Sequence, residues 1–340
     1  MSEIAVIGAG AWGTGISIVL GRKEWHRVRL WAHEKEVCDS IAQRRVNEKF
    51  LPGCSVPDSV TPSNDLASAI DGAQIVVSVM PSQHCRSIFE QMRAHLRPGT
   101  LIISATKGLE ENSLLRMTEV IVQVLDNGGH RPRVGALSGP SFALEVAQGD
   151  PTAVTVASQD GELARIVQHE FSDRSFRVYT NTDVIGVELG GALKNVVAIA
   201  AGICAGLELG QNSVAALITR GLAEMTRLSM ACGGRADTMA GLAGLGDLVL
   251  TCTGGLSRNR SVGVELGRGR KLPEIVAGMH GMVAEGIFTT TAAVGLAKAR
   301  GVEMPITEQM HAILHQGKAP RDAIQELMKR SGKSESALGG

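Results

Sequence analysis

The hydrophobic pattern changes character near the middle of the chain. Before residue 183, short runs of Val, Ile and Leu alternate with segments in which apolar residues recur at helical spacing. Because several of the runs are apolar almost throughout, they predict strands buried on both faces, as in a parallel sheet covered by helices. The predicted strands are Ile4–Ile7, Val28–Trp31, Ile75–Val79, Leu101–Ser104, Val134–Leu137, Ala153–Ala157 and Phe176–Tyr179.

After Asp183 the strand pattern stops, and long segments rich in Ala, Gly, Leu and Met predict helices, including Asn212–Cys232, Thr289–Arg300 and Thr307–His315. A chain of 340 residues is also long for one hydrophobic core. We therefore predict an α/β domain over residues 1–182, with a doubly wound and mostly parallel sheet, and an all-helical domain over residues 183–340. The last residues, Ser331–Gly340, are predicted to form a disordered tail.

One apolar segment, Leu189–Leu207, contains a single charged residue, Lys194. An ammonium in such a segment loses water, which costs free energy unless a partner or ligand compensates. A membrane span is disfavoured because a central Lys is costly there and no second apolar run follows. Two interpretations remain level for this segment alone: a Lys that snorkels to solvent, and a catalytic amine that faces a cleft.

Composition excludes several classes of function. The 34 Lys and Arg residues balance 34 Asp and Glu residues, and 3 Trp, 1 Tyr and 6 Phe offer few stacking surfaces, so nucleic-acid binding is not expected. The six cysteines form no CxxC pair, which indicates reduced thiols in the cytoplasm, and we expect no secretory signal at the N-terminus. His311 and His315 lie one helical turn apart without a third ligand nearby, so no metal site is expected.

The first predicted strand runs into a glycine motif, G-x-G-x-x-G, that precedes a helical segment. Gly8 permits a tight turn, Gly10 lets the backbone approach a pyrophosphate, and Gly13 lets the helix pack on the sheet. Because the motif lies between a strand and a helix at the start of a βαβ unit, it predicts a Rossmann-type dinucleotide-binding domain.

The choice of nicotinamide cofactor is left open by the second predicted strand. The position after this strand is Ala32, where many NAD-binding chains have an acid. His33 and Lys35 tolerate a 2′-phosphate, whereas Glu34 suits a ribose. NAD and NADP are both possible cofactors, and NADP or dual use is favoured.

Polar residues follow two neighbouring predicted strands. In an open α/β sheet the ligand crevice lies beyond the carboxyl ends of the strands, so Lys107, just after Leu101–Ser104, is expected where cofactor and substrate meet. The turn Ser138–Ala143 follows another strand and offers amides and hydroxyls. Ser141 fits a ligand contact and a helix cap equally well.

Two polar motifs stand out in the helical half. Asp247 and Thr251 are spaced i and i+4, on one helix face, where a carboxylate could tune and orient a Lys amine, although Asp247 could also cap its helix. The run Ser257–Asn259 suits an anion clamp, because Arg258 has a planar fork for phosphate, although such loops are often only solvated.

These motifs occur in an order that resembles the bacterial type of NAD(P)-dependent glycerol-3-phosphate dehydrogenase. The resemblance covers Ile4 to about Met328 and is carried by Gly8–Gly13, Asn47 with Phe50–Gly53, Ala105–Glu110, Ser138–Ala143, Gly191–Val196, Gly241–Thr251 and Ser257–Asn259. It implies reversible reduction of dihydroxyacetone phosphate to sn-glycerol 3-phosphate with NAD or NADP, a reaction that supplies phospholipid synthesis.

The resemblance also implies roles for individual residues. Lys194 is the expected proton acceptor, and Lys107 and Asp247 complete the predicted catalytic set. Predicted substrate contacts are Lys107, Gly139, Ser141, Lys194, Asn195, Asp247, Thr251, Ser257, Arg258 and Asn259. Predicted cofactor contacts are Gly8, Gly10, Ala11, Trp12, Gly13, His33, Lys107, Ala143, Arg258, Val283 and Glu285. Ala11 departs from the Ser or Thr of many members, so a hydrogen bond to the pyrophosphate is expected to be missing.

Two other functions compete with this interpretation. Another two-domain hydroxyacid dehydrogenase would share the cofactor domain, but its carboxylate substrate suits the Ser257–Asn259 clamp less well than a phosphate does. A non-catalytic nicotinamide-binding sensor would have no reason to keep both Lys107 and Lys194. The expected partners are a small phosphorylated substrate and a second copy of the chain, with no membrane insertion and no nucleic acid.

Overall fold

A computed structural model describes residues 2–126, 132–279, 281–332 and 334. The chain divides into two compact units: residues up to Thr106 with Met117–Val184, and Lys107–Arg116 with the residues from Ile185 on. Lys107–Arg116 therefore groups with the helical unit, whereas the boundary predicted at residue 182 placed it in the N-terminal domain. That residues 1–182 and 183–340 are separate domains stays a prediction. Most of the predicted C-terminal tail, residues 333 and 335–340, lies outside the described residues.

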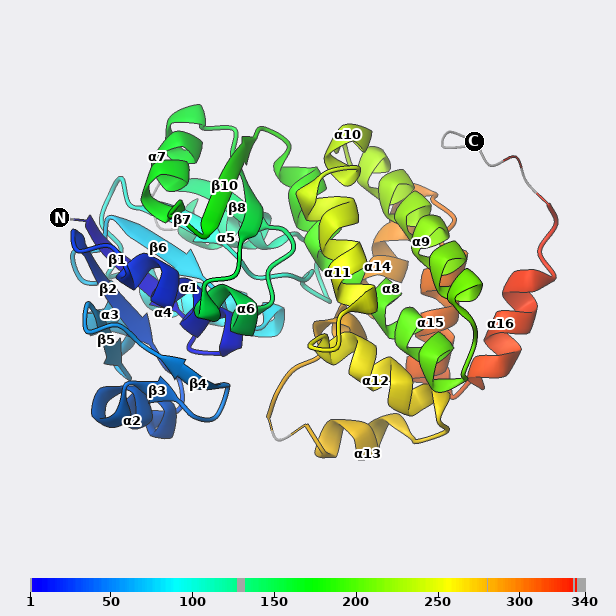
Figure 1. Ribbon diagram of the computed structural model, residues 1–340. Coiled ribbons are helices and arrows are strands. Elements are labelled where there is room, and N and C mark those ends of the chain that lie inside the picture. The colour runs from blue at the N-terminus through cyan, green and yellow to red at the C-terminus, as the bar shows by residue number, and fades with distance from the viewer. Residues whose placement is uncertain (1, 127–131, 280, 333, 335–340) are drawn as a thin grey trace. The chain divides into compact units, whose positions relative to one another are not determined.

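The first unit is built on an eight-stranded sheet with the order β10-β9-β8-β7-β6-β1-β2-β5 among its described residues (Figure 1). Neighbouring strands pair in parallel, except that β8 and β9 are antiparallel, which confirms the prediction of a mostly parallel sheet. The strands are β1 (Ser2–Ile7), β2 (His26–Trp31), β5 (Val60–Ser63), β6 (Ile75–Ser78), β7 (Leu101–Ser104), β8 (Arg133–Ser138), β9 (Thr152–Ala157) and β10 (Phe176–Asn181).

All the predicted strands are present, and the sequence missed the edge strand β5. This strand is short and contains Pro62, which interrupts a strand pattern and is tolerated at a sheet edge. A two-stranded ribbon of β3 (Val46–Asn47) and β4 (Leu51–Ser55) was also missed. Its strands are too short to give a pattern that sequence alone would identify.

Helices cover the sheet in two groups. Helix α1 (Ala11–Gly21) contacts α6 (Ala143–Gln148) and α7 (Gly161–Phe171). Helix α4 (Cys85–Met92) contacts α3 (Leu66–Ile70) and α5 (Met117–Asp126). The remaining helices of this unit are α2 (Lys35–Arg44) and the 3-10 turn η1 (Ser82–His84). The apolar strands lie between these layers, so the core follows directly from the continuous apolar runs in the sequence.

The second unit contains helices and no strand among its described residues after β10, as predicted. Helix α8 (Val184–Gly206) is its centre and is buried from Gly186 to Cys204. The other elements are α9 (Gln211–Ala231), α10 (Ala236–Met239), a π-helical turn η2 (Leu242–Gly246), α11 (Asp247–Thr253), α12 (Arg258–Gly267), α13 (Leu272–Ala277), α14 (Glu285–Arg300), α15 (Pro305–Gln316) and α16 (Pro320–Met328).

Among the described residues, α8 is the only unbroken helix that is long and apolar enough to cross a membrane. The pair Ala236–Thr253 and Arg258–Gly267 passes the same test only as a span bent by 48°. The apolar window of α8 is 89% buried inside the protein, and its Leu and Ala side chains lie in the apolar clusters of the helical unit. Its hydrophobicity is therefore that of a core helix.

Glycines bring α8 and α12 into backbone contact. A Cβ at Gly202 would lie 2.0 Å from the carbonyl oxygen of Arg260, and one at Gly263 would lie 2.0 Å from that of Ile199. Gly206 meets Gly267 one turn further along, so each helix contributes a G-x-x-x-G pair. The two helices run in the same direction, and this close approach places the start of α12 beside the middle of α8.

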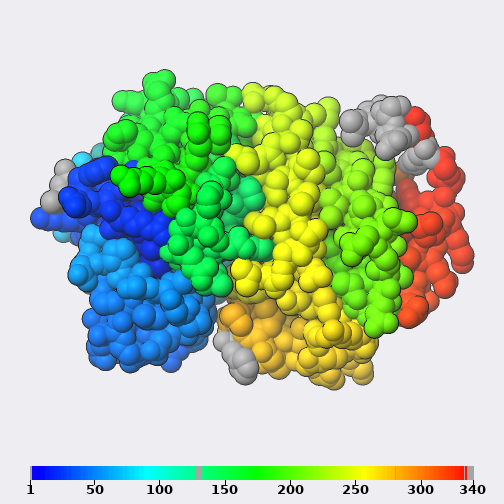
Figure 2. All heavy atoms as spheres, in the orientation of Figure 1, coloured from blue at the N-terminus to red at the C-terminus, as the bar shows by residue number. Residues whose placement is uncertain are grey.

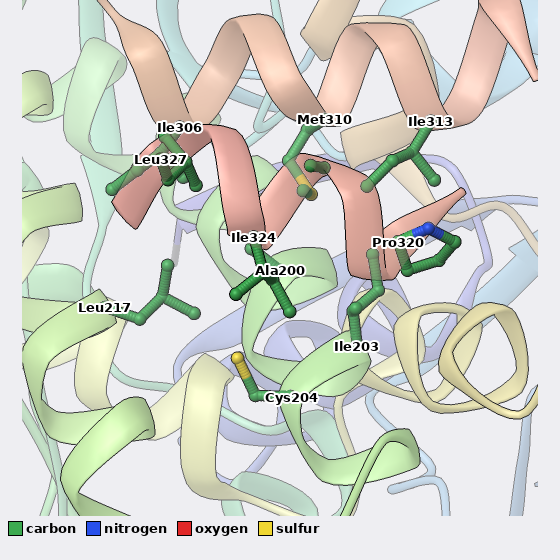
Figure 3. A pocket seen from close by; sticks show the side chains of 11 residues that line it. Ala200, Ile203, Cys204, Leu217, Ile306, Met310, Ile313, Pro320, Ile324 and Leu327 are labelled. Carbon is green, nitrogen blue, oxygen red and sulfur yellow. The ribbon is translucent and has the colours of Figure 1, made fainter. Parts of the chain in front are cut away.

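A small apolar cavity of about 30 Å³ lies between four helices of this unit (Figure 3). Figure 3 shows Ile203 and Cys204 of α8, Leu217 of α9, Met310 of α15 and Ile324 of α16 around it. Although it has room for about one water, its lining offers no polar surface that could bind one. The cavity is therefore a dry packing gap beneath α16.

Substituting Gly202 tests the α8–α12 contact. Gly→Ala inside a helix normally stabilises it, but here the added methyl would collide with a backbone oxygen. We expect Gly202→Ala to lower the free energy of unfolding by at least about 2 kcal/mol in urea titrations. Gly161→Ala is the matched control, because its Cβ would meet nothing closer than 4.0 Å. Equal stabilities of the two variants would contradict a tight contact.

A buried carboxylate, Glu224 of α9, holds the start of α15. It is 3% exposed, and it accepts hydrogen bonds from the backbone N–H groups of Ile306 (2.7 Å) and Thr307 (3.2 Å) and from the Thr307 hydroxyl (3.2 Å). Burial raises the pKa of Glu224 to about 7, although these donors oppose the rise. The folded protein therefore holds a proton on Glu224 more tightly than the unfolded chain does.

This raised pKa gives a pH dependence with a definite sign. The unfolded chain releases the Glu224 proton near its ordinary pKa of 4.5, whereas the folded protein releases it at about 7. Stability contributed by the protonated carboxyl is thus complete below pH 4.5 and is lost as the pH rises to about 7. Relative to Glu224→Gln, the wild-type unfolding midpoint should fall over this interval by several degrees in calorimetry. Parallel midpoints of the two proteins would refute the assignment.

Candidate functional site

The glycine motif forms the turn between β1 and α1. Gly8 has φ +117°, a conformation that favours glycine, and a Cβ there would lie 2.7 Å from the carbonyl oxygen of Val79. A Cβ at Gly13 would lie 1.8 Å from the Gly8 oxygen, whereas one at Gly10 would meet nothing within 4 Å. Gly8 and Gly13 are therefore required by the turn itself, and Gly10 faces open space that a ligand can approach.

The start of α1 fits an anionic group. Its N-cap is Gly10, with no side-chain cap, so the first N–H groups of the helix lack that partner and carry the positive end of the helix dipole. Trp12 lies in the first turn, and its buried indole Nε1 has no hydrogen-bond partner among the described residues. The Asn47 side-chain amide donates to the Ala9 oxygen (2.8 Å) and the Thr14 hydroxyl (2.7 Å), which fixes the turn. These features suit the pyrophosphate of a dinucleotide.

The end of β2 presents His33 to solvent. Its backbone is fixed by the Asn64 amide, which donates to the oxygens of Ala32 (2.6 Å) and His33 (2.8 Å). The Lys35 ammonium forms an ion pair with Asp39 at 2.8 Å, so part of the positive charge expected here is already compensated. The roles of these residues in choosing NAD or NADP stay predictions.

The turn after β8 contains Gly139, Ser141 and Ala143. Gly139 has φ +145°, and a Cβ there would lie 2.9 Å from the Cα of Val154. The Ser141 hydroxyl donates to the Gly139 oxygen at 2.9 Å. The N-cap of α6 is Phe142, so the interpretation of Ser141 as the helix cap is wrong. The predicted ligand contacts of this turn stay predictions.

In the helical unit, one buried carboxylate bridges two lysines. Asp247 is 1% exposed, and its Oδ2 accepts a hydrogen bond from the Lys107 ammonium at 2.7 Å. Its Oδ1 accepts one from the Lys194 ammonium, which also donates to the Thr251 hydroxyl at 2.8 Å. Thr251 in turn donates to the Asp247 backbone oxygen at 2.6 Å, so its lone pairs face Lys194. The structure thus brings together the predicted catalytic residues Lys107, Lys194 and Asp247.

Burial decides the electrostatics of this cluster. Lys194 is 6% exposed, so the interpretation of a side chain that snorkels to solvent is wrong. Burial lowers the pKa of Lys194 to about 7, with the charge of Lys107 acting in the same direction and Asp247 opposing it. Burial also disfavours the charged form of Asp247, but the two ammonium groups outweigh it and lower its pKa. Near neutral pH, Lys194 can therefore both donate and accept a proton.

A chain of hydrogen bonds orients two amides next to this cluster. The N–H of Gly286 donates to Asn259 Oδ1 at 2.9 Å, and Asn259 Nδ2 donates to Asn195 Oδ1 at 2.9 Å. This chain links α14, α12 and α8 and leaves the Asn195 Nδ2 group with a long contact, 3.5 Å, to the Gly191 oxygen. The side-chain oxygen of Asn195 is therefore engaged by Asn259, whereas its NH2 group makes, among the described residues, only the long contact to Gly191. The Asn259 side chain uses its oxygen and one N–H to hold the three helices together.

The predicted anion clamp is the start of α12 rather than a loop. Ser257 is the N-cap, and its hydroxyl accepts from the Arg260 N–H at 3.2 Å. Arg258 is the first helical residue and is exposed. Desolvation by the surrounding protein lowers the pKa of the Arg258 guanidinium, and the charge of Glu285, at the start of α14, opposes this lowering. Val283 is half-buried just before α14, and its predicted cofactor contact stays a prediction.

Three residues of the helical unit were missed from the sequence. Gly286 was passed over although its neighbour Glu285 was selected, and a Cβ there would lie 2.7 Å from the Asn195 oxygen. Arg116 forms an ion pair with Glu188 of α8 in the helical unit. Among the described residues, no group of three or more His, Cys, Asp and Glu side chains could hold a metal ion.

Two family models match the chain. The model for the N-terminus of NAD-dependent glycerol-3-phosphate dehydrogenase matches residues 3–164, and the model for its C-terminus matches residues 183–325.

Individual relatives are similar over nearly the whole length. A glycerol-3-phosphate dehydrogenase [NAD(P)+] from Koribacter versatilis is 68% identical to this chain. The alignment covers 98% of this chain and 99% of the relative. A second glycerol-3-phosphate dehydrogenase [NAD(P)+], from Acidobacterium capsulatum, is 56% identical. This alignment covers 98% of this chain and 100% of the relative. A crystal structure of glycerol-3-phosphate dehydrogenase from Coxiella burnetii has 41% identity and a TM-score of 0.92, covering 97% of this chain and 99% of that one.

The amide chain can be tested by a single atom change. In Asn259→Asp, a carboxylate oxygen would replace the donor and oppose Asn195 Oδ1, so we expect a loss of about 1–3 kcal/mol in the free energy of unfolding. In an Asn195→Ala background the same change should cost less, because the opposing oxygen is gone. A double-mutant cycle in urea measures this coupling. Equal costs in the two backgrounds would show that the amides do not interact.

Proposed function

Because the chain belongs to the NAD-dependent glycerol-3-phosphate dehydrogenase family, we propose that it reduces dihydroxyacetone phosphate to sn-glycerol 3-phosphate and catalyses the reverse reaction. The observation that carries this proposal is the buried Lys194 amine, held by Asp247 and Thr251 with its pKa lowered to about 7. A ketone reductase needs such a group to supply the proton for the alcohol oxygen.

Residues of the chain supply the proton for the substrate oxygen and stabilise the negative charge that develops on it. When bound, the reduced nicotinamide supplies a hydride to the carbonyl carbon. An ammonium has three N–H groups, and Lys194 directs two of them to Asp247 and Thr251. No described residue accepts the third, so we assign it to the substrate oxygen, to which Lys194 delivers its proton as negative charge develops. Lys107 adds positive charge to the cluster and stabilises that oxygen. In the reverse direction, neutral Lys194 accepts the proton of the hydroxyl.

The substrate phosphate is assigned to the start of α12. The Arg258 guanidinium offers paired N–H donors in one plane. The backbone N–H groups at the start of the ten-residue helix α12 also favour an anion. Asn195 and the remaining N–H of Asn259 are further donors, and Gly139 and Ser141 are proposed to join them. Binding energy gained at the phosphate orients the carbonyl for reaction.

The cofactor is assigned to the glycine turn and the start of α1. Gly8, Gly10 and Gly13 admit the pyrophosphate, Trp12 contributes its indole N–H, and Ala11 offers its backbone N–H without a side-chain hydroxyl. Ala143, Val283 and Glu285 are the further cofactor contacts proposed. With His33 exposed and Lys35 paired to Asp39, we propose dual use of NAD and NADP.

The cellular setting extends the same proposal. We infer a cytoplasmic enzyme that supplies the glycerol phosphate backbone of phospholipids and works as a homodimer without membrane insertion. The helical unit exposes apolar side chains, among them Leu245, Val249 and Leu256, that a second copy could cover. Figure 2 shows the yellow segment that contains these residues at the surface.

The decisive experiment measures initial rates of NADH and NADPH oxidation with dihydroxyacetone phosphate. Wild-type protein should turn over, and Lys194→Met should lower kcat by at least about 100-fold, because the proton donor is lost. For oxidation of sn-glycerol 3-phosphate, kcat should rise with pH through about 7 as Lys194 becomes neutral.

Lys23→Met is the control for the loss of a buried lysine. Lys23 is 8% exposed and its pKa is also lowered by burial, but its ammonium bonds the oxygens of His169 and Glu170 in the first unit. This variant should keep its kcat. Equal kcat in Lys194→Met and wild type would remove Lys194 from the chemistry. Turnover of a 2-keto acid alone would indicate a hydroxyacid dehydrogenase, and nucleotide binding without turnover a sensor.

A further inference from the structure

Lys107 is delivered to Asp247 by a short hairpin that belongs to the helical unit. The hairpin comprises Lys107–Arg116, with a β-bridge between Leu109 and Arg116. Backbone hydrogen bonds of 2.9 Å join Glu110 to Leu115 and Leu114 to Glu110 across its turn. Its geometry is therefore defined over only ten residues, and its first residue carries the ammonium that contacts Asp247.

The hairpin is attached to α8 in two ways. Leu109 is 2% exposed and lies in the same apolar cluster as Leu189 and Leu193 of α8. Arg116, directly opposite Leu109 at the bridge, forms an ion pair with Glu188 of the same helix. The side chains of this pair are 14% and 5% exposed. One rung of the hairpin is thus fixed by apolar packing on one strand and by a buried ion pair on the other.

Apolar packing also holds the hairpin on the core. Leu109 and Leu114 already pack against the apolar cluster, and a Cβ at Gly295 would lie 3.0 Å from Leu114. Buried ion pairs pay a large desolvation cost and are often no more stabilising than apolar residues of similar size. An Arg–Glu ion pair adds geometric specificity, because the Arg116 guanidinium contacts the Glu188 carboxylate only in a narrow range of positions.

We propose that Arg116 and Glu188 are positioning residues that fix the register of the hairpin on α8 and so hold the Lys107 ammonium at Asp247. This inference rests on the proposed function, in which Lys107 stabilises charge on the substrate. Lys107 precedes the fixed rung by two residues, so a shift of the rung moves the ammonium. Displacements of about 1 Å at such a group are enough to reduce catalysis substantially.

Neutralising the pair together tests the proposal without leaving one buried charge alone. In Arg116→Met/Glu188→Gln, amide hydrogen exchange across residues 108–116 should accelerate about tenfold, because the hairpin opens more often. The charged groups that act on Lys194 are Asp247 and Lys107, and Lys107 lowers its pKa. The rising limb of kcat for sn-glycerol 3-phosphate oxidation should therefore move to higher pH by about half a unit or more. It should move in the same direction in Lys107→Met.

A second variant covers failure of the double variant to fold. Glu188→Asp keeps the charge but withdraws the carboxylate by one methylene, so Arg116 can follow it only by shifting the hairpin. Both readouts should change in the same direction as above, by a smaller amount. Arg133→Met is the matched control, since it breaks the Arg133–Asp160 ion pair (2.6 Å) of the first unit and should move neither readout.

The outcomes separate this inference from the proposed function. Unchanged exchange of residues 108–116 and an unchanged pH limb in a folded double variant, or in Glu188→Asp, would overturn the positioning role. Absence of turnover in wild-type protein would instead count against the function, while the exchange rates would still report whether the ion pair holds the hairpin.

Discussion

The site depends on one carboxylate that is shared by two ammonium groups away from water. Asp247 is 1% exposed and contacts both Lys107 and Lys194. Without it, two positive charges would face each other in a buried place, and Lys194 would have to deprotonate or the helices would have to separate. With it, burial still outweighs the attraction of Asp247 for the Lys194 ammonium, and the charge of Lys107 acts in the same direction as burial. The Lys194 amine is therefore left near its midpoint at neutral pH.

Glycines determine where these charges can meet. A Cβ at Gly190 of α8 would lie 2.5 Å from the Ala243 oxygen, so the π-helical turn before Asp247 approaches α8 only because that side chain is absent. Gly202 does the same for α12, and Gly286 for α14. Three polar segments therefore reach the level of Lys194 through backbone contacts. Helix α8 looks from its sequence like an apolar span, but its glycines are the contact points of a polar site.

Sequence predicted the parts of this arrangement that are local. The buried strands gave continuous apolar runs, and the i, i+4 spacing of Asp247 and Thr251 correctly placed both on the face that meets Lys194. Contacts between distant segments left no such pattern. Asn259 binds an amide 64 residues away, and Arg116 binds a carboxylate 72 residues away. These residues become partners because glycines allow particular helices to approach each other closely. No local pattern in the sequence shows which helices will do so.

A shifted pKa does not by itself mark a catalytic group, as two buried side chains of the helical unit show. Burial brings the pKa of both Glu224 and Lys194 to about 7. The Glu224 carboxylate receives three donors from the first turn of α15, which accounts for its presence as a structural cap. Lys194 directs only two of its three N–H groups to described residues. The remaining N–H donor, rather than the pKa shift, distinguishes the Lys194 amine, which we propose acts on a ligand, from the Glu224 carboxylate, which holds a helix.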